Sequence, residues 1–169
     1  ALKEGKSTIG KPVMGKKLQA PVFGMTVPIR DAGGAIIGAL SGVTHLGKPN
    51  FLDAVTDQRY GRTGGYMLVA PQYRMVVTAT DKRRSMEILP SPGVLPVVDR
   101  FVEGYEGYQT GVNPQGVEIL AAAKSVPMAG WYLAVALPTA EAFAPIEDMK
   151  QRMLLATVLL TLLAASLTW

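Results

Sequence analysis

The strongest constraint on this chain is an apolar run at its C-terminal end. Residues 153–169 read MLLATVLLTLLAASLTW and contain no charged side chain. At a rise of about 1.5 Å per residue, a helix of this length spans roughly 25 Å, slightly less than the hydrocarbon core of a bilayer. The alternative is a buried or interfacial helix, but such a helix normally keeps a polar face, and only hydroxyl side chains interrupt this run. The run therefore predicts a transmembrane helix, truncated at Trp169, with a domain held against one side of the membrane before it.

Composition narrows the class of that domain. The segment before the apolar run is long enough for one ordinary domain with a real core. The formal charge is +4, from 17 Lys and Arg against 13 Asp and Glu, and the densest basic cluster is Lys82-Arg83-Arg84. No basic stripe with interleaved aromatic residues occurs, which argues against nucleic-acid binding. The sequence has no cysteine, which excludes disulfides, thiolate metal sites and cysteine nucleophiles. The N-terminal residues do not have the pattern of a signal peptide, so we expect this sequence to be a segment of a longer protein.

Turn residues divide the chain into short antiparallel elements. Asp31-Ala-Gly-Gly34 separates two strand-like runs and predicts a β-hairpin, and Pro71-Gln-Tyr-Arg74 predicts a second one. Three further strands are expected at residues 108–112, 117–126 and 131–137, short helices at 49–57 and 97–102, and a helix that starts at Thr139 and runs into the apolar segment. Trp131 could lie in the core or at a membrane interface, and we expect it in the core. This order predicts an α+β fold.

Three short motifs follow one another between the predicted strands. They are VPIRDAGG at residues 27–34, GRTGGY at 61–66 and GWYLAVALP at 130–138. Each is weak alone, but their order and spacing resemble those of the extracytoplasmic Cache sensor domain. The similarity extends from about Gly10 onward and is to the double form, which occurs in bacterial chemoreceptors, sensor histidine kinases and membrane-bound diguanylate cyclases.

The resemblance implies a PAS-like Cache fold, with a central antiparallel sheet of about five strands, flanking helices and a small-molecule pocket on one sheet face. In the double form, a smaller PAS-like lobe lies next to the membrane. The implied division is a membrane-distal lobe at residues 1–104 without the family's N-terminal helix, a reduced membrane-proximal lobe at 105–138, an exit helix at 139–152 and the transmembrane helix at 153–169.

Two departures from the family pattern concern the ligand. The amino-acid-binding members carry an Arg-x-x-Trp-Tyr stretch that grips the ligand carboxylate, and this sequence lacks it. Those members also place an aspartate for the ligand amine at the end of the hairpin strand, where this sequence has Val43. The departures argue against an amino-acid ligand and leave the ligand class open.

No catalytic or metal-binding constellation is present in the sequence. His45 is the only histidine and lacks the partners that a general base or a metal ligand needs, so it is expected at the end of a strand or at the edge of a pocket. No Gly-x-Ser-x-Gly occurs. GRTGGY lacks the Lys-Ser/Thr ending of a P-loop and leads into a strand, which favours a turn. We therefore predict no enzyme activity, no metal and no cofactor.

Candidate ligand-binding residues lie at the ends of the second hairpin. Along MVVTATD at residues 75–81, alternation places Val76, Thr78 and Thr80 on one sheet face, where hydroxyls can meet a ligand. The alternative is that both threonines are only good strand formers on a solvated face. The candidate set is Tyr60, Tyr66, Thr78, Thr80 and Asp81.

The sequence thus predicts an extracytoplasmic sensor domain. We expect it to lie in the periplasm, anchored in the cell inner membrane, and to bind a small molecule of unknown class. Binding would shift the helix that begins near Thr139 and so signal to a cytoplasmic output module, with a diguanylate cyclase or a histidine kinase as the first expectations. The resemblance also implies a homodimer. The alternative is a ligand-independent structural or dimerisation domain.

Overall fold

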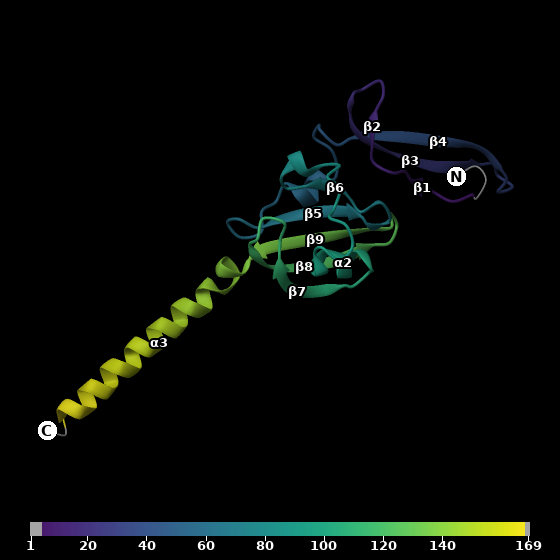
Figure 1. Cartoon of the computed structure of the whole chain (residues 1–169). Coiled ribbons are helices and arrows are strands. Elements are labelled where there is room, and N and C mark those ends of the chain that lie inside the picture. The colour runs from purple at the N-terminus through teal and green to yellow at the C-terminus, as the bar shows by residue number, and fades with distance from the viewer. Residues whose placement is uncertain (1–4, 168–169) are drawn as a thin grey trace.

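In the computed structural model, the chain forms two antiparallel sheets and a long C-terminal helix that follow one another in space (Figure 1). The structure describes residues 5–167, so the first four residues of the expected distal lobe and the last two of the expected transmembrane helix lie outside it. The elements are β1 (Thr8–Ile9), β2 (Val13–Gly15), β3 (Ala20–Arg30), β4 (Ile36–His45), α1 (Asp53–Thr56), β5 (Gly65–Ala70), the 3-10 helix η1 (Pro71–Tyr73), β6 (Met75–Ala79), the 3-10 helix η2 (Lys82–Arg84), α2 (Pro96–Val102), β7 (Gly107–Val112), β8 (Glu118–Val126), β9 (Trp131–Pro138) and α3 (Thr139–Leu167). Both predicted hairpins and the three later strands are confirmed.

The first sheet is the β3–β4 hairpin with two short strands at its edge. β1 and β2 both pair with β3 on the side opposite β4. Asp31 closes the hairpin turn, because its Oδ1 accepts a hydrogen bond of 2.9 Å from the amide of Ala35. His45 ends β4, and its Nδ1 accepts a hydrogen bond of 3.0 Å from the amide of Gly47. The predicted strand-end position of this histidine is confirmed.

The second sheet has five strands in the order β6-β5-β9-β8-β7, with β9 at its centre. β5 comes from before residue 104 and pairs along its length with β9, which comes from after it. The expected boundary between lobes at residues 104 and 105 therefore does not match the sheet that forms. The sequence reveals each hairpin, but it does not show which distant strand β5 takes as its second neighbour.

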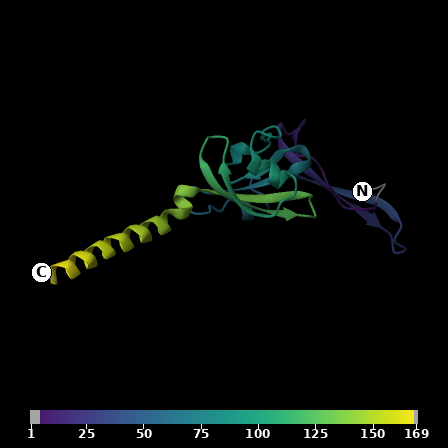
Figure 2. The same ribbon diagram turned by 60° about the horizontal axis from the view of Figure 1, so that its bottom comes forward.

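Each face of the five-stranded sheet contributes to its own core cluster. On one face, Val69, Val76 and Tyr132 contact Val97 and Phe101 of α2. Figure 2 shows α2 on this side of the sheet. Val55 and Thr56 of α1 lie on the opposite side, beside Trp131. The physical cause is the period of two along a strand, which sends successive side chains to opposite faces.

The opposite face holds the first sheet through aromatic side chains. The ring of Trp131 meets that of Phe23 from β3 edge to face, with centroids 5.2 Å apart and planes at 75°. Both residues are buried, together with Leu46. The expectation that Trp131 lies in the core is confirmed, and this contact joins the two sheets.

Alternation along β6 is interrupted by an irregularity in its pairing with β5. The register shifts between Leu68 and Val69, so that Val77 has no partner of its own in the pairing. As a result Val76 and Ala79 share one core cluster, while Val77 lies in the other. The prediction that strict alternation sets the faces of this strand is wrong, because a bulge adds a residue on one strand only.

The C-terminal helix α3 is one continuous element of 29 residues, and Pro145 lies inside it. It leaves the second sheet and points away from both sheets (Figure 1). Thr139–Ser166 is long and apolar enough to cross a membrane, and none of its most apolar window is buried against the rest of the chain. The expected exit helix and transmembrane helix are therefore two parts of a single helix.

Candidate functional site

The five-stranded sheet carries a hollow on each of its faces, and β9 contributes to both. Ala134 and Ala136 face α2 and line a partly enclosed cavity there. Leu133 and Val135 face the other way and line an open groove. Because neighbouring residues of one strand point in opposite directions, these two hollows are separated by the thickness of the sheet.

The partly enclosed hollow, which we call the α2 cavity, has a volume of about 270 Å³. Three alanines, Ala79, Ala134 and Ala136, line it from the sheet, and Val97 and Val98 line it from α2. Methyl side chains are too short to reach the helix above them, so the two layers leave a space between them. Polar side chains surround this apolar interior; they are Thr63, Thr80, Asp81, Arg84, Glu87, Asn113 and Gln115.

The charged groups around the α2 cavity are joined in pairs. The guanidinium of Arg83 donates two hydrogen bonds of 2.9 Å to Asp81 and holds the pKa of that carboxyl below its usual range. Arg84 donates bonds of 2.6 and 3.0 Å to Glu87, and this pairing raises the pKa of Arg84. Bidentate pairs of this kind are strong and directional. The lining charges Asp81, Arg84 and Glu87 are therefore already compensated.

Two of the five sequence-predicted residues, Thr80 and Asp81, line the α2 cavity, and Tyr66 lies at its edge. The ring of Tyr66 points to the other face of the sheet, because Tyr66 pairs with Val135 and both side chains line the open groove. The hydroxyl of Thr80 accepts a hydrogen bond of 2.9 Å from the amide of Tyr66 and donates one of 3.3 Å to the carbonyl of Gln58. Thr80 thus ties the start of β5 to the preceding loop as well as facing the cavity.

The other two predicted residues lie elsewhere. Tyr60 is 52% exposed and forms an isolated β-bridge with Gly64. Thr78 is completely buried and pairs with Leu68 in the sheet. Its hydroxyl has no hydrogen-bond partner among the described residues and it does not line the α2 cavity. The register shift between Leu68 and Val69 turns the side chain of Thr78 to the sheet face opposite the one that the sequence pattern predicts.

Sequence reasoning missed the side of the cavity that comes from α2 and from the turn between β7 and β8. Asn113 and Gln115 belong to a correctly predicted turn, but nothing in the local pattern places that turn beside Thr63 and Asp81. The run WYLAVALP contained a usable signal, since its small residues at 134 and 136 share one face of the strand. Alanines aligned in this way under a helix leave a hollow.

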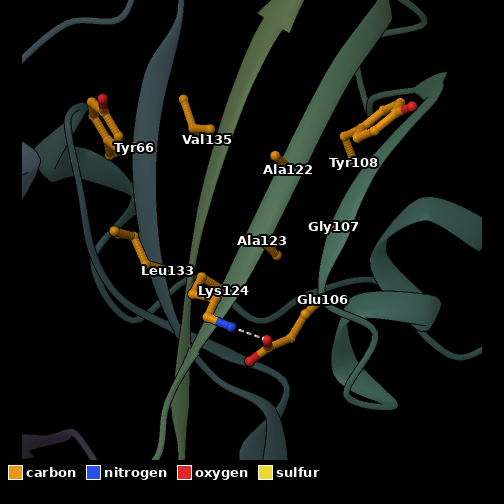
Figure 3. A pocket seen from close by; sticks show the side chains of 9 residues that line it. All are labelled: Tyr66, Glu106, Gly107, Tyr108, Ala122, Ala123, Lys124, Leu133 and Val135. Carbon is orange, nitrogen blue, oxygen red and sulfur yellow. Dashed lines mark hydrogen bonds and ion pairs between the residues drawn. The ribbon is translucent and has the colours of Figure 1, made fainter.

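Figure 3 shows the open groove on the other face of the sheet. Its volume is about 550 Å³, and Ala122, Leu133 and Val135 form its apolar base between Tyr66 and Tyr108. Lys124 and Glu106 form an ion pair at one end. The groove is a wide surface feature with little to enclose a small molecule.

Hydrogen bonds at one end of the open groove lower the pKa of Glu106. Its carboxylate accepts hydrogen bonds from the ammonium of Lys124 and from the hydroxyl and the amide of Ser125, the last at 3.0 Å. These donors, Lys124 first, lower the pKa of Glu106 to about 2. The ion pair fixes the end of β8 to the turn that precedes β7.

A third cavity of about 240 Å³ lies between the two sheets and is lined almost entirely by apolar side chains. Phe23, Leu68 and Trp131 form its inner part, and the exposed Phe51 and Met128 its rim. It offers no polar group that could orient a ligand, apart from Thr56. Across residues 5–167, no three His, Cys, Asp or Glu side chains are grouped so as to hold a metal ion.

Comparison with known families identifies this architecture. A family model for the Cache domain matches residues 1–146. The chain belongs to the Cache domain family. The resemblance drawn from the three sequence motifs and the expected PAS-like fold are both confirmed. Cache domains are sensor modules and not catalysts, so the domain itself is non-enzymatic.

Solved structures with the same fold come from membrane receptors. The extracellular domain of the putative histidine kinase mmHK1S-Z3 has a TM-score of 0.66 at 15% identity, covering 85% of this chain and 53% of that one. The periplasmic sensory domain of the Campylobacter jejuni chemoreceptor Tlp1 has a TM-score of 0.62 at 18% identity, covering 84% and 52%. The ligand-binding domain of the Pseudomonas fluorescens chemoreceptor CtaA, in complex with L-alanine, has a TM-score of 0.53 at 16% identity, covering 81% and 56%.

This Cache domain therefore spans about half the length of the solved chains that it matches. No curated protein matches it. At these identities the structural comparison establishes the shared fold, and the ligands of the neighbours remain properties of those proteins.

Proposed function

We propose that this Cache domain senses a small molecule in the α2 cavity and passes the signal to α3. The observation that carries this proposal is the position of the cavity at the end of the sheet from which α3 leaves. Pro138, the last residue of β9, lines the cavity, and α3 begins at the next residue, Thr139. A molecule bound there contacts the junction between sheet and helix directly.

The lining of the α2 cavity favours a small uncharged or zwitterionic molecule with an apolar part. The alanine and valine surfaces match an apolar group, and the surrounding hydroxyl and amide side chains match polar groups. A ligand with one net charge would have to break the Arg84–Glu87 pair or the Asp81–Arg83 pair, or leave its own charge without a partner. Val43, far from this cavity on β4, does not enter this site.

The strand pairing supports a revised division into lobes. In this proposal, the five-stranded sheet with α1 and α2 is the membrane-proximal lobe, because α3 leaves from its central strand. The first sheet belongs to a distal lobe. The domain lies in the periplasm, α3 crosses the inner membrane, and a homodimer of the whole protein carries a cytoplasmic output module such as a histidine kinase or a diguanylate cyclase.

Thermal unfolding of the full chain in detergent tests ligand binding. A panel of carboxylates, amines, amino acids and purines is added one compound at a time. A true ligand stabilises the folded state by about 2.7 kcal/mol at a concentration one hundred times its Kd. Ala134→Leu fills the α2 cavity and is expected to abolish that stabilisation.

Ala122→Leu is the matched control for this experiment. Ala122 lies on the neighbouring strand β8 and faces the open groove, so the same added volume enters the opposite face. The proposal fails if no compound in the panel stabilises the folded chain, or if Ala122→Leu blocks binding and Ala134→Leu does not.

The alternative is a ligand-independent structural or dimerisation module, and the open groove is the observation that favours it. The apolar side chains Leu133 and Val135 are only half-buried there, in a surface large enough to receive another element. In that case Ala122→Leu changes the oligomeric state measured by sedimentation, while no compound of the panel raises the unfolding temperature.

A further inference from the structure

Glu141, in the first turn of α3, holds the loop at residues 61–64 by three hydrogen bonds. Its Oε1 accepts from the amide of Arg62 at 2.5 Å. Its Oε2 accepts from the amide of Thr63 at 3.1 Å and from the Thr63 hydroxyl at 2.5 Å. The guanidinium of Arg62 adds a longer ion-pair contact of 3.9 Å. We call this set of contacts the Glu141 clasp.

The loop in the clasp fits closely against the end of β9, which explains the glycines of GRTGGY. A Cβ atom on Gly61 would lie 2.5 Å from Oε1 of Glu141, and Gly61 has a positive φ of 67°. A Cβ on Gly64 would lie 2.3 Å from the carbonyl of Tyr60 and 2.9 Å from that of Ala136. Only glycine allows the backbone to approach this near, so the motif serves the contact with α3.

The start of α3 is attached on both sides of β9. β9 lies between β5 and β8 in the sheet, and the clasped loop leads into β5. On the other side, the hydroxyl of Thr139 is 3.3 Å from the carbonyl and 3.2 Å from the carboxylate of Glu118, the first residue of β8. On the Glu141 side three hydrogen bonds end on one carboxylate, whereas on the other side a single hydroxyl is shared between the carbonyl and the carboxylate of Glu118.

Thr63 belongs to the clasp and to the α2 cavity at once. Thr63 lines the cavity from the loop, Gly65 from the start of β5 and Pro138 from the end of β9. The cavity and the first turn of α3 are therefore connected through one short loop. A molecule in the cavity that displaces Thr63 must stretch or break the bonds to Glu141.

We propose that Glu141 couples occupation of the α2 cavity to the position of α3. This proposal rests on the proposed function, since it concerns the route by which that site acts. The clasp gives α3 two discrete arrangements, one with the loop bound to Glu141 and one with it released. Occupation of the cavity shifts the balance between them because an occupant contacts Thr63 differently in each.

Hydrogen exchange on the full chain tests whether the clasp exists. In Glu141→Gln, one acceptor oxygen becomes a donor amide, so exchange at the amides of residues 62 and 63 is expected to rise on the order of tenfold. Thr63→Val removes only the hydroxyl bond and should give a smaller rise. Glu147→Gln is the matched control in the same helix, because Glu147 has only a long contact of 3.8 Å with Lys150. Equal exchange in Glu141→Gln and Glu147→Gln would overturn the clasp.

Spin-label distances test the coupling itself. The sequence has no cysteine, so Met128→Cys and Met149→Cys give two unique labels, on the β8–β9 turn and on α3. Both side chains are exposed, at 95% and 62%. Ala134→Leu serves as the occupant of the α2 cavity, and Ala122→Leu is its control. We expect Ala134→Leu to shift the label distance by roughly 1–2 Å, the scale of known helix shifts.

The decisive comparison repeats this measurement with Glu141→Gln. The shift caused by Ala134→Leu is expected to disappear in that background. An equal shift in both backgrounds, or no shift in the unmodified one, overturns the coupling. Because the cavity is filled by substitution, the label-distance result does not depend on the ligand panel. If no compound of the panel binds, the proposed ligand is lost, but the coupling between the cavity and α3 is still measured. If the label distance does not shift, the coupling is lost, but any ligand binding measured with the panel still stands.

Discussion

The two faces of the five-stranded sheet are built from alternate residues of the same strands, yet they differ in what covers them. On one face, α2 lies over Tyr132 and Ala134 and encloses a cavity. On the other, the first sheet covers Trp131, while Leu133 and Val135 farther along β9 stay half-buried in an open groove. The difference teaches that an apolar strand does not by itself define a binding site. The element above it decides whether a hollow is enclosed.

The first sheet extends the same contrast. Its residue Phe23 is buried against the second sheet, whereas Leu40 and Val43 on β4 are 64% and 65% exposed. The two side chains are three positions apart on a regularly paired strand, so they leave opposite faces of β4. The first sheet therefore exposes apolar side chains on both faces, whereas the α2 face of the second sheet is covered.

The largest expected effect comes from the contact that joins the two sheets. Trp131→Ala removes a buried ring and its contact with Phe23, and should lower the free energy of unfolding by about 3–5 kcal/mol. Val135→Ala on the same face removes a half-buried side chain and should cost about 1 kcal/mol. Urea unfolding measures both values. Similar costs for the two variants would mean that the junction of the sheets is no more important than the open groove.

The next effect concerns one glycine in the loop before β5 and one glycine in the first sheet. Gly64→Ala places a methyl group against two backbone carbonyls and should cost about 1–3 kcal/mol. Gly42→Ala in β4 meets no atom within 4 Å, so it should stabilise the chain by about 0.4–1 kcal/mol through the unfolded state. Thermal unfolding of both variants checks the opposite signs. A destabilising Gly42→Ala would show that another element covers that face of β4.

A smaller effect, which depends on pH, is expected at the end of the open groove. The pKa of Glu106 is about 2 in the folded chain, against 4.5 for an unperturbed glutamate. Because the folded pKa is the lower one, the carboxylate adds stability above about pH 4.5 and loses that contribution as the pH falls toward 2. Glu106→Gln should therefore unfold at a lower temperature than the unmodified chain at pH 7, with a smaller difference at pH 3. A difference that stays constant between these pH values would contradict the ion pair with Lys124.

The smallest effect separates two threonines that the sequence pattern placed together. Thr78→Val replaces a buried hydroxyl without a partner among the described residues, so it should be nearly neutral or stabilise the fold by up to about 1 kcal/mol. Thr80→Val removes the bonds to Tyr66 and Gln58 and should cost about 1 kcal/mol. Urea unfolding compares the two. If Thr78→Val is the more damaging, its hydroxyl has a partner outside the described residues.

Local patterns were sufficient to predict most elements. Asp31 and the glycines after it fix the first hairpin, and Pro138 with Thr139 marks the change from strand to helix, because turn and helix-start preferences act over a few residues. The sequence also placed Tyr66, Thr80 and Asp81 at neighbouring strand ends, where Thr80 and Asp81 line the α2 cavity and the ring of Tyr66 lines the open groove.

Long-range pairing and irregular register were beyond such patterns. The partner of β5 is β9, which lies more than sixty residues later, and no short motif encodes that choice. The bulge at Leu68 reversed the expected direction of Thr78. Glu141 could be read only as a favourable residue at a helix start, because its partners Arg62 and Thr63 lie 79 and 78 residues earlier in the chain.

By itself the sequence determined the apolar helix, the two hairpins and, through three short motifs, the likeness to the Cache domain family. Each of these features depends on residues that are close together in the chain. The tertiary structure alone decided that β5 to β9 form one sheet, that the cavity lies under α2, and that the GRTGGY loop touches the first turn of α3. These features depend on which distant surfaces exclude water together, and the burial of apolar area is not directional enough to be read from a local pattern.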